Sequence, residues 1–389
     1  MNLTPTNEFP NESEIASRLE KVQQEMHKQG LDYYLCHDPD NIFYLTNFAN
    51  FIHERPFIVI VPVSGAITFL IPKLEEPHVQ IRSVGEINYL SYFEFPAPKG
   101  EMWFDRLQDV LKPSHRVGIE SLCPVNVHNA VPGEAIISDI VDDVRMIKSE
   151  FEINRIAYTC QLLNEGHATL LEQAAPGHMP VLSHKEISGS MTQRMITDNL
   201  SSNLLCTNFA AVSQPPNLSH DPHNFTDVLT TMVEGGPHVT VVAGKANGYG
   251  AELERTFFLG HVPEKAKKPF EDMLEARALA YELTIPGNCM SEVDRKVNDF
   301  FKSRGYAKNL LHRTGHSFGV TNHEAPFLAE GYEHEIKPNM IFSIEPGIYL
   351  PSIGGFRFSD TVLVTESGNL KMTKAPETLE ELTLPIKNL

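Results

Sequence analysis

Apolar positions in the first part of the chain follow helical and strand periods in turn. Residues 1–12 predict a loose arm, and the apolar spacing after them predicts a helix that Ser13 caps and Gly30 ends. The same spacing predicts a helix over residues 102–111. Strands are predicted from short apolar runs at residues 31–36, 57–63, 66–72, 87–93 and 116–120. This alternation is typical of an α/β layer.

The second part of the chain has longer helical repeats and a strand-rich end. Ser149 precedes an apolar repeat with two acidic residues in its first turn, which predicts a capped helix ending near residue 175. Residues 212–225 are rich in loop-forming residues. Helices are predicted at residues 184–200, 264–284 and 291–304, and strands at 239–243 and between 310 and 370. This order predicts an α+β domain with a curved, mainly antiparallel sheet.

The change between these two patterns marks a domain boundary. Residues 142–148 predict a short extended exit from the first domain, and the Ser149 cap begins the next. We therefore predict an α/β N-terminal domain over residues 1–148 and an α+β C-terminal domain over residues 149–389.

Composition narrows the choice of partners. The chain of 389 residues has a net charge of −18, which disfavours nucleic acid and anionic membrane surfaces. It has no apolar run of about 20 residues and a polar beginning that carries Glu8, so neither a membrane span nor a signal peptide is expected. Five scattered cysteines without a CxxC pair favour reduced thiols and a cytoplasmic location.

Two acidic residues, Glu252 and Glu254, dominate the candidate chemistry. They lie two positions apart in a predicted strand, so both carboxylates point to one face. Adjacent carboxylates repel each other, and a metal ion, a histidine or a cationic substrate must compensate them. The residues themselves leave these three alternatives open.

Four further groups of residues could complete such a site. His316 lies between glycines and His323 follows seven residues later, while Glu345 ends an apolar run and needs a partner if it is buried. Each group also fits an ordinary structural role, such as a surface turn or a solvated strand. The remaining candidates are two histidines in the loop before residue 239 and two charged residues in a later strand: His220, His223, Arg357 and Asp360.

The order of these motifs resembles the superfamily of creatinase, Xaa-Pro peptidases and methionine aminopeptidases. The motifs are Glu-x-Glu-Arg-Thr at 252–256, Gly-His-x-x-Gly at 315–319, His-Glu at 323–324, Glu-Pro-Gly at 345–347 and Arg-x-x-Asp at 357–360. The resemblance covers essentially the whole chain. It implies the pita-bread fold of the peptidase family M24 for the C-terminal domain, and an enzyme that hydrolyses C–N bonds.

The resemblance also implies that part of the family's metal site is missing. Metal-dependent members carry five ligands, Asp, Asp, His, Glu and Glu. Aligned to their pattern, the five positions are Val241, Glu252, His316, Glu345 and Ser359. Two positions lack a carboxylate, so we expect no dinuclear site and no cofactor. The alternative is a single Mn, Zn or Fe ion on Glu252, His316 and Glu345.

The departures resemble creatinase, the metal-free branch of the superfamily. That likeness implies that Glu254 and Glu345, with Glu252 and Arg357, bind a guanidino or amino-acid-like substrate. It also implies that Arg55 reaches the partner's site in a homodimer. His223 is the expected acid and base, with His323 in support and His220 as the reserve.

The expected function is therefore a metal-independent, creatinase-like hydrolase of a small molecule. Two alternatives remain: a metal-dependent Xaa-Pro dipeptidase, aminopeptidase or related lyase with an altered metal site, and a pita-bread protein that only binds peptides.

Overall fold

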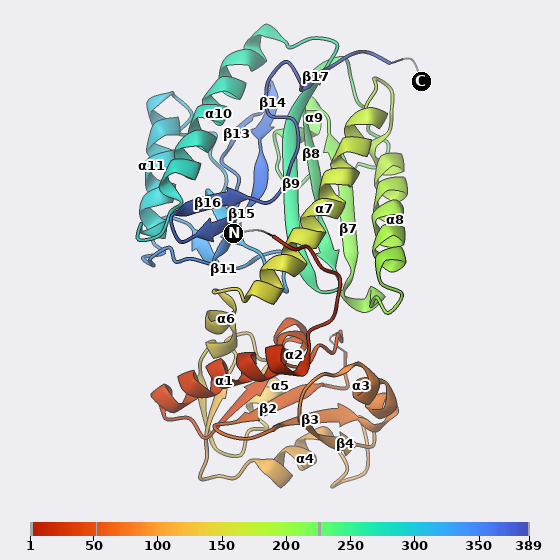
Figure 1. Ribbon diagram of the computed structural model, residues 1–389, viewed down its shortest axis with the longest axis vertical. Coiled ribbons are helices and arrows are strands. Elements are labelled where there is room, and N and C mark those ends of the chain that lie inside the picture. The colour runs from red at the N-terminus through yellow and green to blue at the C-terminus, as the bar shows by residue number, and fades with distance from the viewer. Residues whose placement is uncertain (1–2, 52, 225–226, 388–389) are drawn as a thin grey trace. The chain divides into compact units, whose positions relative to one another are not determined.

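The computed structural model describes residues 3–51, 53–224 and 227–387 and divides into two compact units (Figure 1). One unit comprises Glu8–Arg145. The other comprises the residues up to Asn7 and those from Met146 onward. The chain thus begins in one unit, forms the other, and returns; the change at Arg145 lies near the predicted boundary after residue 148.

The unit formed by residues 8–145 is an α/β layer, as predicted. Its six strands have the order β4-β3-β2-β1-β5-β6, with antiparallel pairs at β1–β2 and β2–β3 and parallel pairs elsewhere. The strands are β1 (Tyr33–Cys36), β2 (Ile58–Pro62), β3 (Ile67–Pro72), β4 (Ile87–Tyr92), β5 (Arg116–Ile119) and β6 (Glu134–Ile137). The helices are α1 (Glu12–Gln29), α2 (Pro39–Thr46), α3 (Glu76–Arg82), α4 (Trp103–Val110), α5 (Val125–His128) and α6 (Ile140–Arg145), with a 3₁₀ turn at Lys73–Glu75.

Two local predictions in this unit were wrong. The first helix is capped by Asn11, not Ser13, because the Asn11 side chain accepts a hydrogen bond from the Glu14 amide. Gly30 ends that helix as predicted, in the left-handed conformation that glycine adopts without strain. The extended exit predicted for residues 142–148 begins instead with helix α6.

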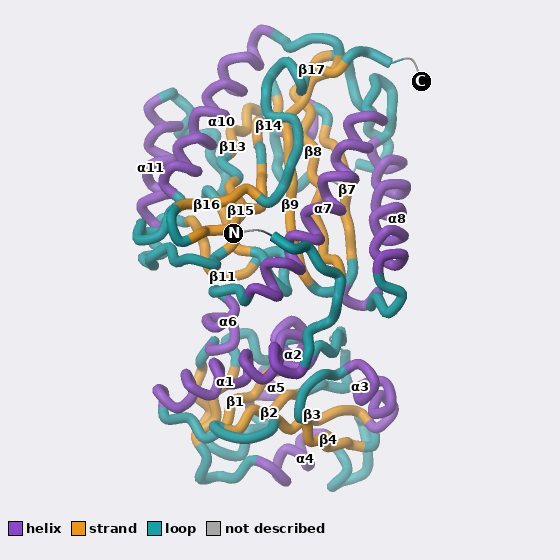
Figure 2. Tube along the Cα trace, viewed as in Figure 1, coloured by secondary structure: helices purple, strands orange, loops and turns teal. Residues whose placement is uncertain are grey.

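The other unit is built on a nine-stranded, mainly antiparallel sheet (Figure 2). Its main path has the order β11-β10-β12-β15-β9-β8-β7, with β16 on β15 and β17 on β9. The strands are β7 (Asn208–Gln214), β8 (Gly235–Ala246), β9 (Tyr249–Leu259), β10 (Gly315–Ser317), β11 (Glu324–Leu328), β12 (Ile341–Ile344), β15 (Ser359–Thr365), β16 (Gly368–Lys371) and β17 (Thr383–Leu384), beside a separate hairpin of β13 (Gly347–Leu350) and β14 (Gly354–Arg357).

Helices cover this sheet and bury its core. The helices are α7 (Glu150–Gln173), α8 (Pro180–Asp198), α9 (Pro216–Ser219), α10 (Glu264–Leu283) and α11 (Met290–Ser303), with a 3₁₀ turn at Leu204–Cys206. Helix α7 begins at the predicted cap, Ser149, which forms a capping box with Glu152, and the helix packs on β8 and β9. Among the described residues, no helix combines the length and the apolarity needed to cross a membrane.

The beginning of the chain is anchored rather than loose, which corrects the prediction for residues 3–12; residues 1 and 2 lie outside the described part. Asn7 is buried, and its side-chain oxygen accepts hydrogen bonds from Arg155 and Asn247. Its backbone carbonyl accepts another from Asn199, and Thr4 bonds to Asn154. The arm therefore ties α7 and α8 to the β8–β9 turn.

The β8–β9 hairpin is the longest strand pair in this unit. Its turn requires positive φ at Asn247 (48°) and Gly248 (90°), which suits an Asn-Gly pair. Residues 208–214, partly assigned to a loop by the sequence, form strand β7 and extend the sheet beside β8. Phe225, at the end of that predicted loop, lies outside the described residues.

Two buried histidines predict acid sensitivity of the C-terminal unit. His167 and His238 are almost fully buried, and burial lowers the pKa of His167 to about 3 and of His238 to about 4. The unfolded chain binds these protons near pH 6.5, so the stabilisation is complete above that pH and is lost as the pH falls towards 4.

We expect His238→Gln to reduce the loss of unfolding free energy between pH 6.5 and 4.5 by roughly 2–3 kcal/mol. Urea titrations at both pH values test this. The matched control is His261→Gln, because the His261 side chain is 60% exposed. An unchanged slope in His238→Gln would contradict the assignment.

Candidate active site

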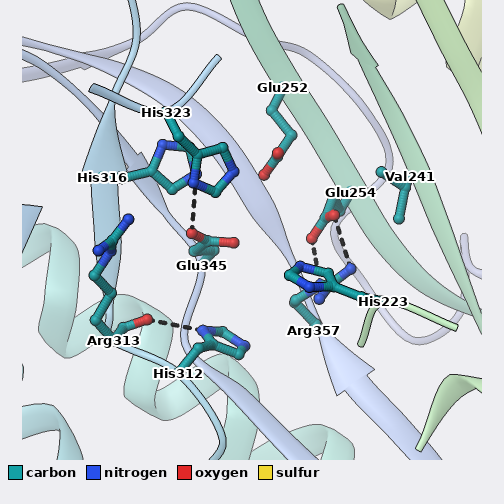
Figure 3. A pocket seen from close by; sticks show the side chains of 10 residues that line it. All are labelled: His223, Val241, Glu252, Glu254, His312, Arg313, His316, His323, Glu345 and Arg357. Carbon is teal, nitrogen blue, oxygen red and sulfur yellow. Dashed lines mark hydrogen bonds and ion pairs between the residues drawn. The ribbon is translucent and has the colours of Figure 1, made fainter. Parts of the chain in front are cut away.

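A cavity of about 560 Å³ gathers most of the candidate residues (Figure 3). Its walls come from β8, β9, β10, β14, the segments before and after β10, the residue that follows β12, and the loop after α9. The lining residues are His223, Val241, Glu252, Glu254, His312, Arg313, His316, His323, Glu345 and Arg357. The sequence had suggested each of the three glutamates, which the β-sheet now brings to one place.

Three adjacent strands place Val241, Glu254 and Ser359 in one row across the sheet. Val241 on β8 pairs directly with Glu254 on β9, and Glu254 pairs directly with Ser359 on β15. Directly paired residues in a sheet project to the same face. Val241 and Ser359, the two positions that lack an expected metal-binding carboxylate, are thus the neighbours of Glu254 on either side. In this row only the central residue, Glu254, carries a carboxylate, whereas the expected metal site would have one at each of the two outer positions.

The Glu254 carboxylate is compensated by Arg357. The Arg357 Nη2 group donates to Glu254 Oε1 at 2.8 Å, and Nε faces the other carboxylate oxygen. Arg357 Nη1 donates to the Tyr349 hydroxyl at 3.1 Å, and this hydroxyl lies 2.6 Å from His312 Nε2. Burial opposes the charge of Arg357, but the acidic groups around it, Glu254 foremost, outweigh this effect and raise the pKa of Arg357. The arginine is therefore a resident cation of the site.

The other two glutamates lie beside the two motif histidines. His316 Nε2 lies 3.2 Å from Glu345 Oε1, and the rings of His316 and His323 stack with centroids 3.6 Å apart. Burial, followed by the charge of Glu252, raises the pKa of Glu345 to about 8. Burial, followed by His316, lowers the pKa of His323 to about 4. Both shifts favour the uncharged forms of Glu345 and His323 near neutral pH.

The donor groups fit one metal ion better than two. One ligand atom from each of Glu252, His316 and His323 lies within 4.8 Å of the others, and the same holds for Glu252, Glu254 and Glu345. Glu252 belongs to both groups, and its buried Oε1 has no hydrogen-bond partner among the described residues. Val241 offers no ligand atom and Ser359 only a hydroxyl, so the five-ligand set for two ions is incomplete.

The remaining predicted residues fall in different places. His223 lines the cavity, whereas His220 is absent from its described lining. Arg55 belongs to the other unit, where it pairs with Glu54 and Glu94 at 3.4 and 3.5 Å. Asp360 has a structural role, because it forms buried ion pairs with Arg255 and Arg277 at 2.9 and 2.6 Å.

Two lining residues escaped the sequence analysis. His312 and Arg313 lie three and two residues before the Gly-His-x-x-Gly motif, and both line the cavity. Burial lowers the pKa of His312 to about 4, and its Nδ1 bonds to the Arg313 carbonyl. The sequence signal that could have identified these two residues is a histidine four positions before His316, followed directly by an arginine.

A buried ion pair fixes the loop that carries the two motif histidines. Lys148 Nζ donates to Ser317 Oγ at 2.9 Å and to Glu324 Oε1 at 3.0 Å, and both charged side chains are at least 95% buried. Glu324 also accepts from the Thr321 amide. Lys148 therefore anchors both ends of the segment from His316 to His323, through Ser317 and Glu324.

Comparison with known families agrees with this architecture. Residues 154–366 match metallopeptidase family M24, and residues 18–147 match the creatinase/prolidase N-terminal domain. The chain belongs to metallopeptidase family M24. The predicted fold, an α/β domain followed by a pita-bread domain, is confirmed, and so is the predicted class of enzyme, a hydrolase of C–N bonds.

Relatives of this M24 chain extend over its whole length. The Xaa-Pro dipeptidase of Pyrococcus furiosus is 27% identical over 372 residues, which are 94% of this chain and 100% of that protein. The crystal structure of the prolidase from Pyrococcus horikoshii superposes with a TM-score of 0.81 at 24% identity, covering 93% of this chain and 99% of the other. Dipeptidase PepE from Mycobacterium ulcerans gives 0.83 at 22% identity, covering 97% and 100%.

These relationships change the balance between the predicted functions. They favour the Xaa-Pro dipeptidase alternative over a metal-independent, creatinase-like hydrolase. The expectation of no cofactor is likewise unsupported in this M24 chain, because the family is one of metallopeptidases; a single divalent ion is compatible with the grouped ligands.

The Lys148 ion pair yields a stability prediction. We expect Lys148→Met to lower the unfolding free energy by about 3–5 kcal/mol, because Glu324 loses its buried countercharge. Urea unfolding measures the change. Lys302→Met is the control, since its salt bridge is exposed. A loss below about 1 kcal/mol would show that water reaches Glu324.

Proposed function

We propose that the protein hydrolyses the peptide bond of Xaa-Pro dipeptides with one divalent cation bound by Glu252, His316 and Glu345. The observation that carries this proposal is that all three side chains line one cavity, where His316 Nε2 lies 3.2 Å from Glu345 Oε1. It is supported by full-length relatives named Xaa-Pro dipeptidases. A bound ion would supply Lewis-acid polarisation of the scissile carbonyl.

The histidines of the cavity provide proton transfer in this proposal. His223 takes a proton from the attacking water as the new C–O bond forms, and it returns that proton to the nitrogen as the C–N bond breaks. His323, which burial keeps neutral, supports this transfer, and His220 remains the reserve. Glu254 stays paired with Arg357 and shapes the wall instead of carrying the proton.

A second candidate function is hydrolysis of a small guanidino compound without metal. The specific observation in its favour is the row of Val241, Glu254 and Ser359, which lacks both outer carboxylates. In this alternative, Glu252 and Glu345 bind the substrate cation through charge-assisted hydrogen bonds. A screen of N-alkyl guanidino acids on chelated protein distinguishes it from the dipeptidase.

The resemblance supports three further parts of the proposal. The protein functions in the cytoplasm, with domains 1–148 and 149–389. It forms a homodimer in which Arg55 of one protomer reaches the site of its partner. Sedimentation analysis of the intact chain tests the dimer, and turnover by mixtures of Arg55→Ala and Glu252→Gln protomers tests the shared site.

The proposed ion yields a prediction about stoichiometry and activity. Purified protein should take up one Mn, Zn or Fe per chain, and Ala-Pro hydrolysis should vanish on chelation and return with the metal. Glu252→Gln should lower kcat/KM at least 100-fold and weaken metal binding, because it removes a ligand charge. Elemental analysis and calorimetry measure the metal. Undiminished Ala-Pro turnover in metal-free protein would rule out the metal-dependent mechanism, and absence of Ala-Pro turnover in metal-loaded protein would rule out the dipeptidase proposal.

The row across the sheet yields a separate prediction. The triple variant Val241→Asp, Glu254→Thr, Ser359→Glu should bind two ions per chain, because it returns both outer carboxylates and removes the central one. The single variant Glu254→Thr is the control and should not gain an ion. Equal metal content in the triple variant and the wild type would refute the claim that the carboxylates missing at positions 241 and 359 prevent binding of a second ion.

A further inference from the structure

A second cavity, of about 410 Å³, adjoins the candidate active site. Its walls are mostly apolar and include Ala210, Val212, Leu218 and Val228, and its described lining contains no lysine or arginine. Val241 lines both cavities, so the two share a wall. The second cavity is large enough for a bulky side chain, since small-molecule pockets start at roughly 300 Å³.

The row of paired residues across the sheet continues into this second cavity. Val212 on β7 pairs directly with Val241 on β8, and Val241 pairs directly with Glu254 on β9. Directly paired residues project to the same face of a sheet, and Figure 3 shows Val241 beside Glu254. A carboxylate at position 241 would place a charge where the two cavities meet. With valine there, the shared wall is apolar.

The second cavity also contains a buried amide with a fixed orientation. Gln214 is only 1% exposed, and its Nε2 group donates to the carbonyls of Asp221 and Asn224 at 3.1 and 3.0 Å. Only the NH₂ end of an amide can donate, so these two bonds fix Oε1 as the free end. Gln214 Oε1 is buried and has no hydrogen-bond partner within the described part of the chain. A buried acceptor without a partner is costly, so it favours a ligand that carries a donor.

Spacing and charge indicate what kind of donor fits. Gln214 lies two residues after Val212, on the same face of β7 and about 7 Å further along the strand. Asp227 is at an exposed part of the lining, and its Oδ1 already accepts from the Leu229 amide. A cation buried beside the neutral Gln214 amide would lack a countercharge. An apolar ring that ends in a hydroxyl group matches both the length and the polarity.

We propose that the second cavity binds the side chain of the first substrate residue, and that Gln214 selects a side chain ending in a neutral donor, as tyrosine does. This inference rests on the proposed dipeptidase function and deepens it, because it names the class of the variable residue Xaa. Proline carries no side-chain donor, so the occupant is Xaa and not the proline. Gln214 thus acts as a specificity-determining residue.

The test compares kcat/KM for Tyr-Pro, Phe-Pro and Ala-Pro on metal-loaded protein. The wild type should prefer Tyr-Pro over Phe-Pro about 10- to 100-fold, because Phe-Pro leaves the buried acceptor unpaired. In Gln214→Met this ratio should fall to about 1. Gln214 also holds the carbonyls on either side of His223, so both rates should fall together and the ratio is the readout. The control is Gln193→Met at an exposed position of α8, which should keep the wild-type ratio.

A second variant fills the cavity instead of changing its polar group. Ala210→Phe should lower Tyr-Pro turnover about 10-fold or more and leave Ala-Pro turnover close to that of the wild type, because alanine does not reach beyond Val241. Equal turnover of Tyr-Pro and Phe-Pro by the wild type, faster turnover of Lys-Pro, or an unchanged ratio in Gln214→Met would overturn the assignment.

Binding of small aromatic probes keeps the inference separable from the proposed function. In ligand-observed NMR on the intact wild type, 4-methylphenol should bind more tightly than toluene, and Ala210→Phe should abolish binding of both. If the wild type hydrolyses no Xaa-Pro dipeptide, the proposed function fails, while this comparison still decides whether the cavity takes a phenol. Binding of 4-methylphenol no tighter than that of toluene would refute the selection by Gln214.

Discussion

The cost of burying like charges together is the constraint on which this site depends. Glu252, Glu254 and Glu345 bring carboxylate oxygens within 4.8 Å of one another in the interior of the sheet. Such a group is stable only with countercharge or protons. Arg357 supplies a permanent countercharge to Glu254, which leaves the other two acids to share a metal ion, a substrate cation or a proton. The surrounding fold holds these acids against their repulsion.

The fold meets this constraint through long-range anchors. The β8–β9 hairpin brings Glu252 and Glu254 to the same face, β15 supplies the neighbouring row position, and Lys148 secures the histidine loop. Asp360 lies only three residues from Arg357 but faces Arg255 and Arg277, so it neutralises a separate buried cluster. Two systems of charge are thus kept apart on neighbouring strands.

Local patterns in the sequence predicted most elements, and long-range pairing decided what they missed. The Ser149 cap of helix α7 was evident, because its signal lies within a few residues. Strand β7 was only partly recognised, because its pairing with β8 depends on distant residues. Three features of the site could likewise be recognised only in the assembled sheet. They are the row position of Glu254, its pairing with Arg357 and the place of Arg313 in the cavity. The motifs identified the acids and histidines of the site but not their partners.

The anchored beginning of the chain has a consequence for how the protein is made. Asn7 leaves the ribosome long before its partners Arg155, Asn199 and Asn247. The arm must therefore wait, undocked, while residues 8–145 fold and the β8–β9 turn is synthesised. Completion of the catalytic unit is in this way tied to the segment around Asn7, since the β8–β9 turn closes on residues that are synthesised long before it.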